Sequence, residues 1–363
     1  MVALALEQSL AERILAGERI SAADALELYR WPLAELGALA NARRELAKRD
    51  SYAARGREIV TYIVDRNINY TNVCNVYCKF CAFYRTEKDA DHYVLSFEQL
   101  DHKLDELTAA GGVQMLMQGG HHPKLQFDWY LSLLSHIREK YPHINIHGFS
   151  PPEFQHFSEV FRMPLRDVIR EFKAAGLGSI PGGGGEILVD RVRQRISPLK
   201  CNSDGWLEVM QIAHEEGLNS SATMMFGHVE TVEERIEHLQ RLRDQQDASG
   251  GFTAFICWTF QPENTVLKIK KRTGVAEYLR MQALSRIFLD NFENVQSSWV
   301  TQGPEIGQVA LKYGANDFGS VMMEENVVSS AGTTFRLNAA RIETLIREAG
   351  YEPRRRNNWY QLL

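Results

Sequence analysis

Short apolar runs alternate with longer amphipathic segments from about residue 58 to the end of the chain. A short apolar run bounded by polar or glycine-rich loops is typical of a buried strand, and apolar positions three or four residues apart are typical of a helix. The sequence contains eight such runs, separated by helical patterns. The candidate strands are IVTYIV from Ile59, VQMLM from Val113, INI from Ile144, LGSI from Leu177, SATMMF from Ser221, FTAFICW from Phe252, VQSSWV from Val295 and ANDF from Ala315.

The ends of several predicted helices are marked in the sequence. Ser96 with Gln99, and Thr231 with Glu234, have the spacing of a capping box, in which the two side chains bond to each other's free backbone N–H groups. The first of these helices carries one apolar stripe, formed by Phe97, Leu100, Leu104 and Leu107. Such a stripe should pack on a sheet.

The order of these elements predicts an α/β fold. Eight strand–helix units in about 290 residues match a (β/α)8 TIM-type barrel. The spacing also suits an open doubly wound sheet, although that fold rarely needs eight such regular units. Residues 1–50 have helical periodicity and no strand pattern, so we expect N-terminal helices that cap the barrel. The predicted division is 1–50 for this extension, 51–350 for the barrel and 351–363 for a C-terminal tail.

Composition limits the classes of function. The chain has 363 residues, of which 44% are hydrophobic and 24% charged, as in an ordinary globular protein. A net charge of -5 without a long basic run offers no surface for nucleic acid or an anionic membrane. No apolar run approaches the roughly 18 residues of a spanning helix, and the N-terminus lacks a secretion pattern. We therefore expect a cytoplasmic protein that binds neither nucleic acid nor membrane.

Three of the five cysteines, Cys74, Cys78 and Cys81, lie in the loop after the first predicted strand. In a barrel this loop lies at the C-terminal mouth, where active sites are found. Three thiolates can bind three irons of a 4Fe-4S cluster and leave the fourth iron open, whereas an electron-transfer cluster normally has four cysteines. A structural zinc site is the alternative, with His92 as the nearest fourth ligand.

The other two cysteines, Cys201 and Cys257, stand alone in the sequence. A lone cysteine is usually a small buried apolar residue. An odd number of cysteines, with three in one loop, also argues against a disulfide framework.

The Cys-x3-Cys-x2-Cys spacing, with Phe80 directly before the last cysteine, resembles the signature of the radical S-adenosylmethionine (SAM) superfamily. This resemblance implies that SAM binds the open iron and that an electron from the cluster cleaves it to methionine and a 5'-deoxyadenosyl radical. The protein then positions the reacting groups and excludes water from the site. It also implies a reductant such as flavodoxin or ferredoxin.

Two further stretches resemble superfamily positions around SAM. Gln118 to Gly120 is similar to the segment that receives the SAM amine, with His121 in place of an acid. Thr223 to Glu230 is similar to the segment beside the adenine, with Thr223 in place of a glycine. With the glycine run at 182–185, which offers space for a ribose, the resemblance implies these cofactor-binding residues: Phe80, Gln118, Gly119, Gly120, Ser150, Glu186, Gly227 and Glu230.

Longer blocks resemble one family over nearly the whole chain. They are Asn67 to Asn72, Cys81 to Arg85, Leu116 to Gly120, Ser179 to Gly184, Phe260 to Thr265, Ser298 to Pro304 and Gly314 to Ser320. These blocks are similar to the cyclic dehypoxanthine futalosine synthases of menaquinone biosynthesis. The implied reaction takes hydrogen from the ribose C4' of dehypoxanthine futalosine, closes a ring on the benzoate, and then releases one electron and one proton.

Two alternatives stay open. Aminofutalosine synthases and the deazaflavin (FO) synthase components share the cysteine loop and barrel, and only the longer blocks favour the cyclase over them. From another class, a non-catalytic iron–sulfur electron carrier would not cleave SAM.

The implied nucleoside-like substrate carries a carboxylate, hydroxyls and an aromatic ring, which predicts a cation, polar side chains and apolar walls. His147 is the candidate proton acceptor because histidine titrates near neutral pH, and Trp258 and Trp299 are candidate walls. The catalytic or substrate-binding candidates, taken from the ends of predicted strands, are His147, Glu153, Arg191, Gln261, Glu263, Gln302, Asn316 and Asp317. For each of them, an ordinary loop or core position is the alternative interpretation.

Overall fold

The computed structural model describes residues 10–269 and 272–363, so the first nine residues of the predicted N-terminal extension lie outside the described residues. The strands of the described part form one parallel sheet in the order β10-β1-β9-β8-β7-β6-β5-β4-β3-β2. They are β1 (Ile59–Ile63), β2 (Asp65–Ile68), β3 (Gln114–Met117), β4 (Asn145–Gly148), β5 (Ser179–Ile180), β6 (Asn219–Phe226), β7 (Phe252–Thr259), β8 (Val295–Gln296), β9 (Asp317–Ser320) and β10 (Glu352–Arg355).

The sheet closes on itself because one continuous segment, formed by β1 and β2, joins the strands at its two ends. Only Val64 separates β1 from β2, yet β1 pairs with β9 while β2 pairs with β3. At the junction, the backbone N–H of Val113 donates to the Val64 carbonyl (3.2 Å) and that of Met323 to the Asp65 carbonyl (3.3 Å). With β1 and β2 counted as one strand and β10 as an addition, the predicted (β/α)8 TIM-type barrel is confirmed.

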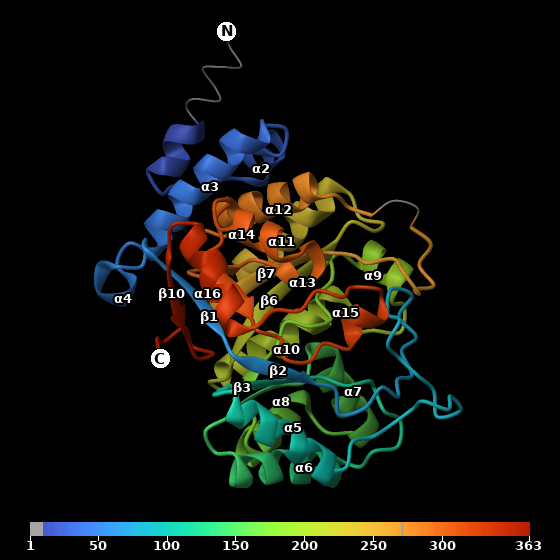
Figure 1. Ribbon diagram of the computed structural model, residues 1–363. Helices are drawn as coiled ribbons and strands as arrows, with labels where there is room; N and C mark the ends of the chain where they lie inside the picture. Colours follow the sequence, from blue (N-terminus) through green and yellow to red (C-terminus); the bar gives the residue numbers. More distant parts are fainter. Residues whose placement is uncertain (1–9, 270–271) are drawn as a thin grey trace.

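Helices fill the connections between successive strands and lie outside the sheet (Figure 1). They are α2 (Ala22–Leu28), α3 (Leu33–Lys48), α4 (Ser51–Ala54), α5 (Phe97–Ala109), α6 (Phe127–Lys140), α7 (Pro151–Phe161), α8 (Leu165–Ala175), α9 (Asp190–Ile196), α10 (Ser203–Glu215), α11 (Val232–Ser249), α12 (Val275–Phe288), α13 (Trp299–Gln302), α14 (Pro304–Ala310), α15 (Val327–Ser330) and α16 (Ala339–Glu348). No helix among the described residues is both long enough and apolar enough to cross a membrane.

Local sequence explains where these helices begin and which face they bury. Both predicted capping boxes are present, at Ser96 with Gln99 before α5 and at Thr231 with Glu234 before α11. In α5 the predicted stripe faces inward, and its three leucines are buried. The helices therefore cover the sheet with the faces that their periodicity predicts.

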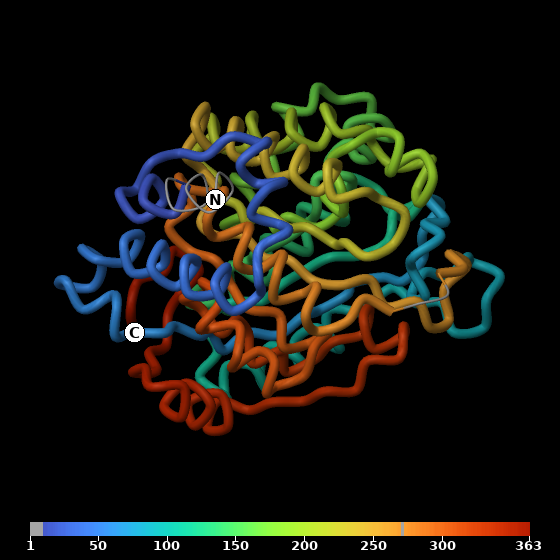
Figure 2. Tube along the Cα trace, turned by 90° about the horizontal axis from the view of Figure 1, so that it is seen from above, coloured from blue at the N-terminus to red at the C-terminus, as the bar shows by residue number. Residues whose placement is uncertain are grey.

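The N-terminal helices form an additional layer. α2 packs against α11, and α3 packs along α12 (Figures 1 and 2). Lys48, at the end of α3, is buried and donates to Glu293 (2.6 Å) and Asn294 (3.1 Å) just before β8. The division of the chain at residues 50 and 350 stays a prediction.

Two strands differ from the sequence-based expectation. The run from Val295 forms strand for only two residues, because Ser298 then turns and its N–H donates to the Tyr278 hydroxyl (2.7 Å) before α13 begins. The tail adds β10, which is polar because it lies at the edge of the sheet and its side chains stay partly exposed. Both views place this segment (red) beside β1 (blue) (Figures 1 and 2).

We expect Phe172→Ala in α8 to lower the free energy of unfolding by about 3–5 kcal/mol. The ring is fully buried, with the rings of Phe149 and Phe157 at 5.0 and 5.2 Å between centroids. Urea denaturation followed by circular dichroism measures this loss. The neighbouring exposed Glu171→Ala should change stability by less than about 0.5 kcal/mol; an equal effect of both variants would contradict the assigned packing.

Candidate active site inside the barrel

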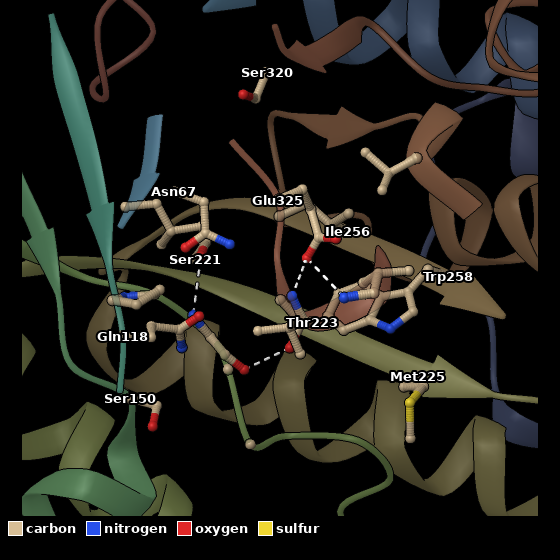
Figure 3. A pocket seen from close by; sticks show the side chains of 18 of the residues that line it. Asn67, Gln118, Ser150, Ser221, Thr223, Met225, Ile256, Trp258, Ser320 and Glu325 are labelled. Carbon is tan, nitrogen blue, oxygen red and sulfur yellow. Dashed lines mark hydrogen bonds between the residues drawn. The ribbon is translucent and has the colours of Figure 1, made fainter. Parts of the chain in front are cut away.

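A cavity of about 440 Å3 occupies the interior of the barrel. Side chains from separate strands point into it, among them Asn67 from β2, Ser221 from β6 and Trp258 from β7 (Figure 3). The cysteine loop lines one end of the cavity, and Arg356 of the C-terminal segment lines the other. The inward positions alternate along each strand, so the barrel itself determines which residues meet.

The cysteine loop brings Cys74, Cys78 and Cys81 together at the cavity. Backbone bonds hold the loop, with the Cys74 N–H donating to Arg85 (2.9 Å) and the Cys81 N–H to the Cys78 carbonyl (3.1 Å). All three thiols are free. Burial raises the pKa of Cys74 and, to about 12, the pKa of Cys78, and the neighbouring thiols add to both shifts.

The three cysteines of this loop suit a 4Fe-4S cluster, in which each cysteine binds a different iron. Neither remaining cysteine lines the cavity: Cys257 donates to Gln282 in the core (3.5 Å), and Cys201 lies beside Arg193.

The predicted SAM-binding segment from Gln118 to Gly120 also lines the cavity. Gly119 is required there, since a Cβ on it would lie 2.4 Å from the ring of Tyr70. Glu153 supports the segment from behind, accepting from the Gly119 N–H (3.1 Å), the Tyr70 hydroxyl (2.8 Å) and both donors of Ser150 (2.7 Å). Because donors occupy both of its oxygens, Glu153 positions the segment and is not free to act as a base.

The two departures from the superfamily pattern have local explanations. Burial lowers the pKa of His121 well below its ordinary value, so this side chain is neutral and cannot replace the charge of an acid. The hydroxyl of Thr223 donates to the Gly182 carbonyl, and the Gly182 N–H donates to Ser221 (3.0 Å) (Figure 3). Thr223 therefore ties the glycine run to β6.

Glu186 and Lys200 form a buried charged pair near the cysteines. Both line the cavity, with Lys200 Nζ 3.1 Å from Glu186 Oε1 and 5.1 Å from the centre of the Phe80 ring. Burial opposes the charge of Lys200, but Cys78 and Glu186 hold its pKa above the ordinary value. Glu186 Oε2 is buried without a hydrogen-bond partner among the described residues. The sequence analysis did not select Lys200, because no pattern in the neighbouring residues marks a lysine in a polar loop as part of a site.

Gly227 and Glu230 are not among the residues that line the cavity, and their contact with SAM stays a prediction. The Glu230 carboxylate accepts from the Gly227 N–H (2.6 Å), the His228 N–H (2.9 Å) and Arg235 Nε (2.8 Å). Despite burial, these donors and charges lower its pKa. Its side chain is fully buried, so Glu230 closes the turn after β6.

Of the predicted substrate candidates, His147, Glu153 and Gln261 line the cavity. The others bond elsewhere: Arg191 to Glu234, Glu263 to Arg272, Gln302 to Thr259, Asn316 to Arg286 and Asp317 to Arg356. The two predicted wall residues, Trp258 and Trp299, do line it. Of the candidates that were chosen because they follow a predicted strand, only some therefore line the cavity.

Sequence reasoning also missed polar residues inside the barrel. Asp65 and Asn67 both line the cavity from β2. Asp65 accepts from Ser320 and from Gln114 (3.2 Å), and burial raises its pKa to about 6. The signal was present in the sequence, because polar residues at alternate positions after an apolar strand face one side.

Comparison with known proteins places the chain in a family. The family model "Radical SAM superfamily" matches residues 68–242, and "CofH/MqnC C-terminal region" matches residues 249–363. The chain is 46% identical over 353 residues to a cyclic dehypoxanthine futalosine synthase of Halalkalibacterium halodurans, covering 97% of this chain and 94% of the relative. The chain belongs to the radical SAM superfamily.

Other relatives of this radical SAM protein agree. A cyclic dehypoxanthine futalosine synthase of Streptomyces coelicolor is 46% identical, with 98% of this chain and 88% of the relative covered. The aminodeoxyfutalosine synthase of Thermus thermophilus is 37% identical, with 97% and 94% covered. The crystal structure of methylornithine synthase superposes with a TM-score of 0.73 at 16% identity, over 95% of this chain and 97% of that one, which supports the fold alone.

Membership of the superfamily implies a 4Fe-4S cluster and SAM as cofactors. The residues present fit both groups, since three free thiols line the cavity and Glu186 Oε2, 3.7 Å from Arg193 Nη1, has no hydrogen-bond partner among the described residues. Buried polar atoms without partners commonly mark the place of a ligand or water.

Replacing Cys74, Cys78 or Cys81 singly by alanine should abolish iron binding in anaerobically reconstituted protein, because each removes one of the three loop thiols. Iron analysis and the absorption of the cluster measure this effect. Cys201→Ala and Cys257→Ala serve as matched controls and should keep wild-type iron content. A loss of iron in Cys201→Ala as complete as in Cys78→Ala would contradict the assignment.

His147 should remain neutral down to about pH 4. Its Nδ1 lies 2.7 Å from the Ser179 hydroxyl, and burial, with the charge of Arg356, lowers its pKa to about 3. The role of His147 as proton acceptor stays a prediction. Between about pH 6.5 and 3 the unfolded chain takes up a proton that the folded chain does not, so this residue lowers stability as pH falls.

His147→Gln should therefore lose less stability than wild type between pH 7.5 and pH 5, as measured by urea denaturation. His102→Gln, at an exposed helix position, is the control. Imidazole NMR shifts of His147 that titrate near pH 6.5 in the folded protein would contradict the low pKa.

Proposed function

We propose that this radical SAM protein catalyses the reaction of cyclic dehypoxanthine futalosine synthase, the ring closure of dehypoxanthine futalosine in menaquinone biosynthesis. The observation that carries the proposal is 46% identity to proteins of that name over nearly the full length of the chain. The match to the CofH/MqnC C-terminal region supports it as well.

When bound, the cluster and SAM supply the 5'-deoxyadenosyl radical that takes hydrogen from the ribose C4'. The chain contributes the three cysteines, and the segment around Gly119 that Glu153 holds in place. Glu186 offers an oxygen without a hydrogen-bond partner among the described residues, 3.7 Å from Arg193 Nη1, for a ribose hydroxyl or the SAM amine, and Lys200 offers a cation for the SAM carboxylate. These roles are consistent with their common position at the cysteine end of the cavity.

Ring closure requires the radical carbon to stay close to the aromatic ring. Ile256, Trp258 and Met225 line the cavity with apolar surface (Figure 3). Holding two reacting groups together can lower a barrier by roughly 7–11 kcal/mol. The cavity of about 440 Å3 has the size of a small-molecule site.

Aminofutalosine synthase is the main competing activity, and the lower identity of 37% to a relative of that pathway disfavours it. An FO synthase component is the second competitor within the superfamily. A simple electron carrier has no need of a large ligand cavity beside its cysteines. The reductant, proposed as flavodoxin or ferredoxin, and the cytoplasmic location remain predictions of the sequence.

Dehypoxanthine futalosine carrying deuterium at C4' should transfer the label to 5'-deoxyadenosine, about one deuterium per product, in anaerobic turnover with SAM and a reductant. The proposed cyclase only takes a hydrogen atom, so 5'-deoxyadenosine must be released. Mass spectrometry of both products measures the transfer. Label retained in the product, or adenosyl carbons joined to the substrate, would refute the cyclase and favour the sibling activity.

A further inference from the structure

The C-terminal segment folds under the barrel at the end opposite the cysteine loop. After β10 the Arg356 N–H donates to the Tyr62 carbonyl (2.9 Å), and the chain then doubles back in a hairpin bridged between Arg356 and Leu362. The N–H of Asn357 donates to the Gln361 carbonyl across this hairpin (3.0 Å). We call residues 352–363 the C-terminal hairpin.

Three alternate residues of this hairpin, Arg356, Asn358 and Tyr360, line the reaction cavity. Trp359, between two of them, is 45% exposed. The alternation shows that one face of the hairpin closes the base of the barrel while the other contacts solvent. The hairpin therefore forms the floor of the cavity.

Arg356 fixes this floor. It is buried and binds Asp317 of β9 through two hydrogen bonds (2.6 and 2.9 Å), and its guanidinium lies 3.9 Å from the centre of the Tyr360 ring. A third N–H donates to the Asn357 carbonyl (3.1 Å). Arginine has five N–H groups, so two of them have no bond to a described residue.

Asn358 adds a second unused donor. The residue is 6% exposed, and its Nδ2 is buried without a hydrogen-bond partner among the described residues. Leaving a buried donor unpaired costs roughly 1–3 kcal/mol unless a ligand or water accepts from it. The floor thus has N–H donors, on Arg356 and Asn358, that can bond to the acceptor oxygens of a ligand.

We propose that Arg356 and Asn358 bind the carboxylate at the aromatic end of the substrate. Given the proposed function, the ribose must lie near the cysteine end for hydrogen transfer, so the benzoate end points toward the floor. Among the described residues, the cations that line the cavity are Lys200, at the cysteine end, and Arg356. A carboxylate has two oxygens and accepts from several N–H donors at once.

The charges around the floor limit the strength of this contact. Asp317 balances the charge of Arg356, and Asp65, which also lines the cavity, opposes a ligand carboxylate. Binding therefore depends on directed hydrogen bonds more than on excess positive charge. Loss of one such bond to a charged group should weaken binding by about tenfold or more.

Benzoate is the probe for this subsite, with benzyl alcohol as the matched ligand without a carboxylate. Saturation-transfer NMR on the reconstituted holoenzyme should give a dissociation constant for benzoate that rises about tenfold in Asn358→Ala. Benzyl alcohol should bind the variant and the wild type equally. Trp359→Ala, the adjacent solvent-facing position, is the control and should leave both ligands unaffected.

An unchanged benzoate affinity in Asn358→Ala, an equal loss for both ligands, or no benzoate binding to wild type would overturn the proposal. If the alanine variant does not fold, Asn358→Asp replaces it. This variant keeps the shape of the side chain and adds a charge that repels the benzoate carboxylate. If neither folds, Asn358 is structural and the proposal fails.

Turnover separates this inference from the proposed function. Asn358→Ala should raise KM for dehypoxanthine futalosine about tenfold, whereas the control Trp359→Ala should leave KM unchanged. A wild-type enzyme that binds benzoate but does not convert the nucleoside refutes the proposed function alone. Turnover with an unchanged KM in the variant refutes the floor subsite alone.

Discussion

Closure of the sheet through the run of residues 59–68 is the constraint on which the rest of the structure depends. This run pairs with β9 through its first half and with β3 through its second half. The same run leads directly into the cysteine loop, so barrel closure and cluster placement share one backbone. A parallel barrel buries its strands on both faces, and all five residues of β1 are buried.

Two buried ion pairs border the cavity. Glu186 and Lys200 pair near the cysteines, and Asp317 and Arg356 pair at the floor. Pairing is necessary because an isolated buried charge would lose its hydration without compensation. Two further carboxylates that line the cavity, those of Asp65 and Glu325, accept hydrogen bonds from neighbouring groups.

Three of the described residues that line the cavity have a buried polar atom without a hydrogen-bond partner in the described part of the chain: Glu186 Oε2, Asn67 Oδ1 and Asn358 Nδ2. They lie on three different parts of the chain, so no local motif explains them together. Each costs stability in the empty protein, and a bound ligand would recover that free energy. Unpaired polar atoms of this kind are typical of a binding site. They lower the stability of the empty protein, and they fix the orientation of the ligand that bonds to them.

The sequence by itself determined the barrel class, the helix caps and the cysteine loop. These features depend on periodicity and on spacing within a few residues, and a local pattern records both. Gly119 was selected by its resemblance to a SAM-binding segment, and the structure adds the physical reason, because the close approach of Tyr70 excludes any side chain there.

Only the tertiary structure decided which of the remaining polar residues meet in the cavity. Glu230 has the right motif, yet neighbouring donors use its carboxylate in a turn outside the cavity. Lys200 and Arg356 reach the cavity from a loop and from the tail, through contacts that no local spacing encodes. The pKa of His147 likewise depends on burial and on Arg356, more than two hundred residues away in sequence. Such long-range contacts arise from the packing of the whole barrel, which is why a single sequence without that packing could not assign them.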